Sequence, residues 1–304
     1  MKCIFIYNPV SGKGKIAKKL DYIVNGLKEK YDEVDVYATK CAGDMSRVSR
    51  EAVGVYDAIV FAGGDGSFNE VVQGIAGLDG LPELGYIPSG TVNDIAHTLK
   101  IPKNIKKALK IIKTGRNELL DCMKVNDGYA MYVVAAGAFT SATYTTPQAQ
   151  KNHVGRIAYW FEGAKRNLHF QIFDVDCENG EVVEHTQSVL ITVMNSRYVA
   201  GFRLNKFACL QDGKIEIAIV RQKKNPSFFQ KLGALFAVAG LFLFGLKRKK
   251  GKNVVRLEGS CFDIDVGDDV IWNFDGEKGS QGKVHIEVVP KKINMIVSKN
   301  VKKL

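Results

Sequence analysis

The chain has 304 residues, of which 46% are hydrophobic and 25% are charged. This length and composition exclude a fibrous or an intrinsically disordered chain and allow two domains, each with its own core. The net charge is +11, and ten of the 43 basic residues but none of the 32 acidic ones lie between Arg221 and Arg256. The remainder is nearly neutral, so this segment carries the excess charge and indicates an anionic partner.

Cysteine usage and the N-terminus bear on the compartment. The six cysteines lie far apart without a CxxC pair, and the five histidines show no zinc spacing. The first residues, MKCIFIYNPVSG, combine a strand-length apolar run with a turn and lack the features of a secretory signal. We therefore expect reduced thiols and a cytoplasmic protein.

Residues 1–122 alternate between strand and helix patterns. Strands are expected at CIFIYN, EVDVYA, YDAIVFAGG and ELGYIP, and helices at KIAKKLDYIVNGLKEK, MSRVSREAV, SFNEVVQGIAGL and KNIKKALKIIKTG. This alternation predicts an α/β N-terminal domain with a parallel sheet, whose ligands bind beyond the carboxyl ends of the strands.

Residues 123–289 have a different texture, with short alternating or apolar runs separated by turn sequences such as NDG, ENG and QDG. The pattern predicts a mainly antiparallel β-sandwich as the C-terminal domain. Two helical insertions are expected within it, at about 154–166 and 227–246. The tail, residues 290–304, is expected to pack back onto the first domain.

Two glycine-rich segments follow predicted strands, at residues 8–15 (NPVSGKGK) and 63–70 (GGDGSFNE). Small side chains and converging backbone N–H groups are what phosphate binding requires. Neither segment matches the Walker pattern or GxGxxG. Asp65 would repel a phosphate unless Mg²⁺ lay between them. A third segment, residues 88–94 (PSGTVND), adds a second carboxylate after a strand, although alone it reads as an ordinary helix start.

These three motifs, in this order and spacing, resemble the catalytic-domain signature of the diacylglycerol kinase family, which includes sphingosine and ceramide kinases and bacterial soluble lipid kinases. The likeness extends over nearly the whole chain through Thr39, Gly155-Arg156, Ala158-Tyr159, Asp212-Gly213 and Asp275-Gly276-Glu277. Ser67 stands where the family usually has Thr, and GAFT at residues 137–140 replaces a common Gly-Phe-Asp sequence. The following TSATYTTP resembles the bacterial soluble branch.

The resemblance implies an active site in the cleft between the two domains, with ATP and Mg²⁺ bound by the first. Asp65 and Asp94 would position the catalytic Mg²⁺. The residues that would cradle ATP are Asn8, Pro9, Val10, Ser11, Gly12, Lys13, Thr39, Gly63, Gly64, Asp65, Gly66, Ser67, Phe68, Asn69 and Thr91.

Two further sites follow from the resemblance. Glu277 aligns with the family's proton acceptor, and Asp275 lies two residues before it in the sequence. The resemblance does not decide which of the two carboxylates takes the proton. The alternative for this segment is a solvated turn without a catalytic role. Asp212, with the main-chain carbonyls of Cys209 and Lys214, matches a structural Mg²⁺ position of bacterial relatives. A plain hairpin turn is the alternative there.

An apolar run at residues 234–246 (ALFAVAGLFLFGL) leads directly into four basic residues, 247–250. Thirteen residues are too few to cross a bilayer, which takes roughly 20. We expect an interfacial element that meets anionic lipid without a transmembrane span. The alternative is a buried helix with a solvated basic end.

The sequence thus predicts a peripheral, Mg²⁺-dependent lipid kinase that transfers the γ-phosphate of ATP to diacylglycerol and forms phosphatidic acid. The alternatives are another lipid alcohol as acceptor (a sphingoid base or a polyprenol), a soluble-substrate kinase resembling NAD kinase or phosphofructokinase, and a non-catalytic module that binds anionic lipid. A nucleic-acid partner is not expected, because the phenylalanines lie in the apolar run rather than among the lysines. Strand edges in the second domain leave room for a homodimer.

Overall fold

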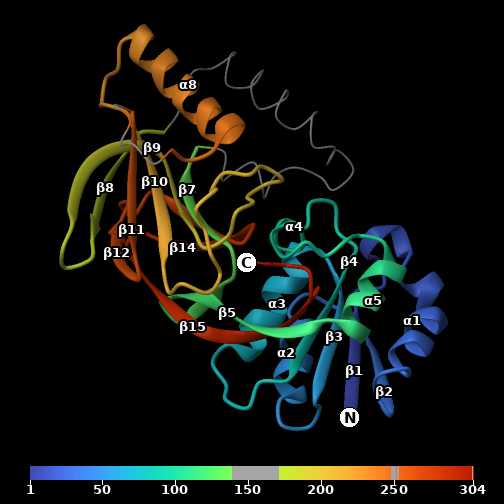
Figure 1. The fold of residues 1–304 in the computed structure, drawn as a ribbon. Helices are drawn as coiled ribbons and strands as arrows, with labels where there is room; N and C mark the ends of the chain where they lie inside the picture. The colour runs from blue at the N-terminus through green and yellow to red at the C-terminus, as the bar shows by residue number, and fades with distance from the viewer. Residues whose placement is uncertain (139–170, 248–250, 252, 303) are drawn as a thin grey trace. The chain divides into compact units, whose positions relative to one another are not determined.

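Figure 1 shows the computed structural model of the chain, which describes residues 1–138, 171–247, 251, 253–302 and 304. Two compact units make up the fold. Unit 1 contains Met1–Cys122, Leu210–Asp212 and Val289–Leu304, and unit 2 contains Met123–Cys209 and Gly213–Val288.

Some features expected from the sequence lie outside the described residues. They are the helical insertion at 154–166, the motif at 140–147, the Gly155-Arg156 and Ala158-Tyr159 pairs and the basic residues 248–250.

The sheet of unit 1 is parallel, with its strands in the order β2–β1–β3–β4. β3 (Ala58–Gly63) and β4 (Glu83–Pro88) are buried throughout, and β1 (Lys2–Tyr7) nearly so, as expected of strands with helices on both faces. β2 (Glu33–Ala38) forms the edge and is largely exposed. β15 (Val284–Val297) pairs with β4 on the other side.

Helices cover both faces of this sheet (Figure 1). α2 packs against α3, and α1 packs against α5, as right-handed crossovers between these strands require. The helices of unit 1 are α1 (Leu20–Leu27), α2 (Asp44–Ala52), α3 (Asp65–Ile75), α4 (Asp94–Leu99) and α5 (Ile105–Thr114). The C-terminal tail is tied to this unit by Arg116, which donates to the carbonyls of Lys299 (3.1 Å) and Val301 (2.7 Å).

The prediction of one helix over residues 15–30 is wrong at its start. Two short 3₁₀ turns, Ser11–Gly14 and Ala17–Lys19, precede α1, and Lys19 has a non-helical backbone with φ −116° and ψ 18°. The second turn buries none of its residues, so no packing interaction selects an α-helix there.

Unit 2 is built from antiparallel strands, as the sequence predicted, and forms a β-sandwich-like domain. β5 (Arg116–Val125) leads into it. Its other strands are β6 (Gly128–Ala130), β7 (Val133–Gly137), β8 (Phe173–Glu178), β9 (Val183–Met194), β10 (Ile215–Arg221), β11 (Val254–Gly259), β12 (Cys261–Asp265), β13 (Ile271–Phe274) and β14 (Glu277–Gln281).

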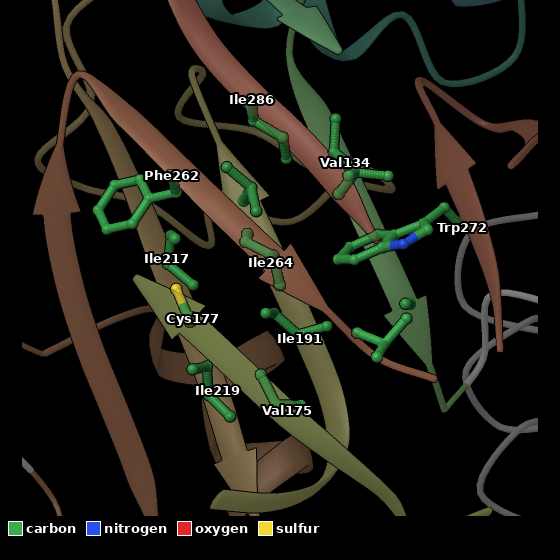
Figure 2. Packing of buried hydrophobic residues seen from close by; sticks show 14 of the residues in the cluster. Val134, Val175, Cys177, Ile191, Ile217, Ile219, Phe262, Ile264, Trp272 and Ile286 are labelled. Atoms are coloured by element: carbon green, nitrogen blue, oxygen red, sulfur yellow. The ribbon is translucent and has the colours of Figure 1, made fainter. Parts of the chain in front are cut away.

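The core of unit 2 gathers alternate side chains from these strands (Figure 2). Trp272, Ile191 and Ile264 are all completely buried. The indole N–H of Trp272 donates to the carbonyl of Gly282 at 2.8 Å, which satisfies the one polar group that its burial would otherwise leave unpaired.

The helix expected at 227–246 is confirmed as α8 (Phe228–Phe244), which packs against β10. It begins with a capping box in which the Ser227 hydroxyl accepts from the N–H of Gln230 while the Gln230 side chain accepts from the N–H of Ser227. In the described part of the chain, no helix combines the length and the hydropathy needed to cross a membrane.

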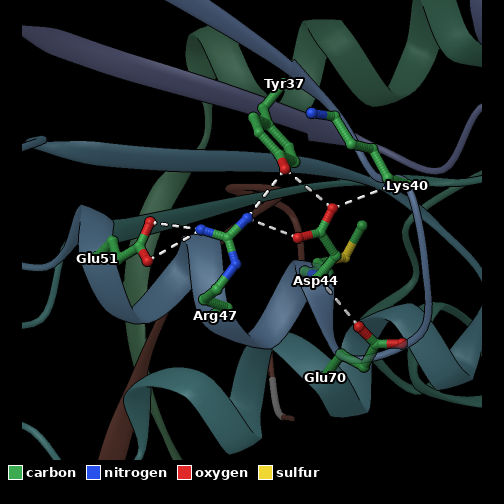
Figure 3. A network of polar contacts seen from close by, with 7 residues as sticks. Tyr37, Lys40, Asp44, Arg47, Glu51 and Glu70 are labelled. Atoms are coloured by element: carbon green, nitrogen blue, oxygen red, sulfur yellow. Dashed lines mark hydrogen bonds and ion pairs between the residues drawn. The ribbon is translucent and has the colours of Figure 1, made fainter.

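A polar network fixes the turn between β2 and α2 (Figure 3). Asp44, the first residue of α2, accepts from the backbone N–H of Lys40 (2.9 Å), from the Tyr37 hydroxyl (3.0 Å) and from Arg47 (2.6 Å). The same guanidinium donates to Glu51 at 2.9 Å. The network therefore holds the chain that follows β2, which contains Thr39.

The Arg47 guanidinium beside Asp44, together with the Lys40 N–H, lowers the pKa of the Asp44 carboxyl to about 2. A lowered folded-state pKa stabilises the fold above the ordinary value of about 4, and this contribution is lost as the pH falls toward 2. Asp44→Asn should therefore lower the free energy of unfolding by an amount that is full above about pH 5 and shrinks toward pH 2. Denaturant unfolding of both proteins across this range measures it, and a difference independent of pH would contradict the assignment.

Candidate functional site

The segments singled out in the sequence follow four parallel strands of one sheet. Residues 8–14 follow β1, Thr39 follows β2, residues 64–69 follow β3 and residues 89–94 follow β4. Since all four strands are parallel, their carboxyl ends meet at the same edge of the sheet. Unit 1 thus brings together the loops from which the sequence predicted a phosphate site.

Direct contacts join the first and third of these loops. The hydroxyls of Ser11 and Ser89 are 2.8 Å apart. Gly12 has φ +61°, and a Cβ at that position would lie 2.8 Å from the Ser89 carbonyl oxygen. Glycine is therefore required at position 12 both by its backbone conformation and by the neighbouring loop.

The second and third loops approach even more closely. A Cβ on Gly90 would lie 2.5 Å from the Cα of Gly64, and one on Gly64 would lie 3.2 Å from the Cα of Gly90. The Ser89 N–H donates to the carbonyl of Gly63 at 2.8 Å. Side chains larger than hydrogen would separate the two turns, so this pair of glycines sets how near the loops lie.

Asp65, the first residue of α3, spans the same two loops. Its carboxylate accepts from the backbone N–H of Asn93 at 2.7 Å and from that of Ile95 at 3.4 Å. Burial raises the pKa of the Asp65 carboxyl, and these N–H groups oppose that effect. Gly64 caps α3 without a side-chain hydrogen bond, so the helix presents its first N–H groups and its positive end beside this carboxylate.

Asn93 is completely buried and adopts the left-handed conformation, with φ +58°. Its side-chain amide donates to the carbonyl of Gly90 at 2.9 Å, and its amide oxygen accepts from the Tyr86 hydroxyl at 3.4 Å. Asp94 follows as the buried first residue of α4. The strained backbone of Asn93 therefore sets the direction in which the chain enters α4, and with it the position of Asp94.

The other predicted nucleotide-binding residues differ in exposure. Ser67 folds over Gly63, where a Cβ would lie 2.1 Å from the Ser67 hydroxyl oxygen. Phe68 and Asn69 are buried, so they support α3 from within, whereas Val10 is exposed. The side chain of Lys13 lies outside the described part of the structure.

Sequence reasoning missed several residues that assemble the loops. It assigned Thr91 and Asp94 from the third segment but not Ser89, Gly90 or Asn93. Their signal was the turn sequence PSGTVND itself, since Asn is enriched several-fold among the few non-glycine residues with positive φ. Lys103 donates to the carbonyl of Thr91 at 2.6 Å, and no local pattern in the sequence indicates this contact.

The residues at this edge fit a Mg²⁺-bound polyphosphate. Gly12, Gly64 and Gly90 let the three loops approach one another, and α3 offers N–H groups to anionic oxygens. Among the described residues no three His, Cys, Asp or Glu side chains form a metal cluster. Two carboxylates, Asp65 and Asp94, suit Mg²⁺, which is commonly held by one or two carboxylates together with substrate phosphates.

Asp275 and Glu277 of unit 2 have different surroundings. Asp275 is buried with φ +50°, and its carboxylate accepts from the N–H groups of Met131 (2.5 Å), Tyr132 (2.9 Å) and Val133 (2.9 Å). Its carbonyl accepts from the Tyr132 hydroxyl at 3.1 Å. Glu277 begins β14 and is exposed. Both carboxylate oxygens of Asp275 therefore accept hydrogen bonds within unit 2, whereas the carboxylate of Glu277 is accessible to a substrate.

The predicted structural Mg²⁺ site is divided by the boundary between the units, because Asp212 belongs to unit 1 and Cys209 and Lys214 to unit 2. Asp212 is exposed in a turn. The Lys214 ammonium lies 3.1 Å from a carboxylate oxygen of Glu258. This metal site stays a prediction, as does the expectation that Glu277 faces the nucleotide loops.

Comparison with known proteins adds to the geometry. Residues 2–125 match the family described as the diacylglycerol kinase catalytic domain, and residues 132–297 match the YegS C-terminal NAD kinase beta sandwich-like domain. A protein of Bacillus subtilis named diacylglycerol kinase is 31% identical over 90% of this chain and 89% of its own length. One of Staphylococcus aureus with the same name is 33% identical over 91% and 86%.

A crystal structure described as a diacylglycerol kinase from Bacillus anthracis has the same fold, with a TM-score of 0.78 over 99% of this chain and 98% of that one at 22% identity. At this identity the likeness speaks for the fold alone. The sequence relatives and the two matched domains carry the assignment further: the chain belongs to the diacylglycerol kinase family of lipid kinases.

Proposed function

We propose that this lipid kinase transfers the γ-phosphate of ATP to the hydroxyl of diacylglycerol and forms phosphatidic acid, with Mg²⁺ bound to the nucleotide. The observation that carries the proposal is the meeting of three glycine turns around the half-buried carboxylate of Asp65. The names of the relatives support diacylglycerol as the acceptor.

In this proposal the backbone of residues 8–14 and the first N–H groups of α3 bind the phosphates. Asp65 and Asp94 hold Mg²⁺, which when bound neutralises charge on the polyphosphate. The lipid hydroxyl oxygen bonds to the γ-phosphorus, the bond from that phosphorus to the bridging oxygen of ADP breaks, and Glu277 takes the hydroxyl proton. Asp275 holds the turn before Glu277 through three backbone N–H groups.

The acceptor can be tested directly. Purified protein is incubated with radiolabelled ATP, Mg²⁺ and mixed micelles of diacylglycerol, sphingosine or a polyprenol, and with NAD or fructose 6-phosphate in solution. Labelled phosphatidic acid as the main product supports the proposal. Preferential labelling of any other acceptor would replace diacylglycerol by that substrate.

Asp65→Asn should lower kcat by at least about 10²-fold, because the amide still accepts from the Asn93 N–H but cannot hold a cation. Thermal stability should fall only modestly, because the amide nitrogen would replace the oxygen that accepts the long 3.4 Å bond from the Ile95 N–H. Asp79→Asn, which changes an exposed carboxylate of the same unit, is the control and should leave kcat within about twofold. A near-normal rate for Asp65→Asn in the micelle assay would refute the role of Asp65.

Glu277 and Asp275 should separate in their effects. Glu277→Gln should lower kcat by about 10²–10⁴-fold without changing thermal stability, since the side chain is exposed. Asp275→Asn should lower stability, because its amide group would face N–H donors and each unpaired N–H costs about 1–3 kcal/mol. Activity and thermal unfolding are measured on both variants. A stable, active Glu277→Gln protein would remove Glu277 as the proton acceptor.

The enzyme can reach diacylglycerol only at a membrane surface. We infer that the protein is cytoplasmic and that its basic segment, from Arg221 to Arg256, binds the membrane peripherally. A homodimer stays a prediction from the sequence. Each base near an anionic surface contributes about 1 kcal/mol, so reversal of residues 247–250 to Glu should weaken vesicle binding by roughly 10³-fold or more. Binding to the wild type should also weaken as salt rises.

Co-sedimentation with vesicles containing phosphatidylglycerol measures this attachment. Reversal of Lys106, Lys107 and Lys110, which are exposed lysines of α5, is the control for general charge. Equal losses in both variants, or binding that does not respond to salt, would contradict the assignment.

A further inference from the structure

α8 carries a row of exposed apolar side chains, although five of its 17 residues are buried. Phe229, Phe236 and Leu243 are spaced seven residues apart, so they lie along one line of the helix, and they are 81%, 66% and 62% exposed. Phe228 and Phe244, next to the two ends of the row, are also exposed. Large exposed aromatics gathered on one element mark an interaction surface.

A groove of about 250 Å³ lies beside this row, between the second half of α8 and the residues around the start of β11. Phe236, Gly240 and Phe244, each four residues apart, line its helix side, and Val254 lines the opposite side. A Cβ on Gly240 would meet nothing within 4 Å. The glycine therefore leaves open the space that a side chain would fill.

Basic groups stand at the rim of the groove. Lys247 and Arg256 both line it. The Arg256 guanidinium lies 4.7 Å from the Phe207 ring centroid and forms an ion pair with Glu258 at 2.6 Å, yet its Nε is buried without a hydrogen-bond partner among the described residues. Lys247 is exposed and Arg256 lines the groove, so both are cationic hydrogen-bond donors beside a ligand bound there.

We propose that this groove binds one acyl chain of an anionic membrane lipid, while the row of Phe229, Phe236 and Leu243 enters the bilayer surface. The chain packs against the apolar lining, and the oxygens of its headgroup accept from Lys247 and Arg256. This proposal rests on the proposed function and adds to it the surface through which the lipid kinase contacts the membrane.

Charge selects a bilayer over a protein partner. No acidic residue lies between Arg221 and Arg256, and Lys223, Lys231 and Lys247 form no ion pair with any residue that the structure describes. Arg221, Lys224 and Arg256 do pair with acidic residues of neighbouring strands, so those first three lysines carry the excess charge. Exposed aromatic side chains with such lysines beside them are the composition of interfacial membrane helices. The groove is also slightly smaller than the roughly 300–1,000 Å³ of pockets for drug-sized ligands, so it accommodates part of one acyl chain.

Two variants at one position test the groove. Gly240→Leu fills it, whereas Gly240→Ala adds only a Cβ that meets open space, and both raise helix propensity. Fluorescence of cis-parinaric acid, an acyl probe, is measured in solution without vesicles. Gly240→Leu should weaken probe binding by at least about tenfold and Gly240→Ala by less than about twofold. Equal binding by Gly240→Leu and wild type, or equal losses in both variants, would overturn the proposal.

A third variant separates the row from the groove. Phe229→Ser combined with Leu243→Ser changes residues that do not line the groove. It should weaken binding to phosphatidylglycerol vesicles by about tenfold or more while keeping the affinity for the probe. Loss of probe binding in this variant would contradict a distinct groove.

Failure of the proposed function is distinguishable from failure of the groove. Wild type that phosphorylates no lipid would overturn the proposed kinase reaction, while the probe comparison would still decide the groove. Conversely, an active enzyme whose Gly240 variants bind the probe as wild type does would overturn the groove alone.

Discussion

The hydrogen bond from the Asn93 N–H to the Asp65 carboxylate is the interaction on which the site of unit 1 depends. It joins the loop after β3 to the loop after β4, and it is possible only because Gly64 and Gly90 let the two backbones approach. Desolvating a carboxylate is costly unless it accepts hydrogen bonds, so this contact also sets the orientation of the half-buried acidic group. Asp65 therefore has a structural bond and retains lone pairs for a cation.

Unit 2 uses a buried aspartate in a related way. Asp275 binds three successive backbone N–H groups and, like Asn93, adopts a left-handed conformation that residues other than glycine seldom take. Such strain persists where the surrounding structure enforces it. In each unit the residue that fixes a turn precedes one offered for chemistry: Asn93 precedes Asp94, and Asp275 precedes Glu277.

The sequence predicted the fold well where burial is strong. The apolar runs of β1, β3 and β4 and the alternating strands of unit 2 gave the parallel and antiparallel sheets, and the position of the glycine segments after strands gave their common edge. It failed where tertiary contacts decide. The start of α1 is the clearest case, because residues 17–19 before it bury no side chain that would select an α-helix.

The candidate site shows the same division. The glycines and aspartates of the site could be identified from their sequence motifs. The contacts of Gly64 with Gly90 and of Lys103 with Thr91 could not, because no local pattern relates these residues. The different surroundings of Asp275 and Glu277 likewise depend on residues 131–133, far away in the chain. For α8, hydropathy predicted the helix but not which phenylalanines it exposes.

Hydrogen–deuterium exchange in the presence and absence of ATP and Mg²⁺ tests the central claim most directly, because it reports where the nucleotide binds. The account predicts slower exchange of backbone amides in residues 8–14, 63–69 and 89–94 when both are added, and a smaller effect with ATP and a chelator. Unchanged exchange in all three segments under saturating nucleotide, with protection confined to other parts of the chain, would contradict it.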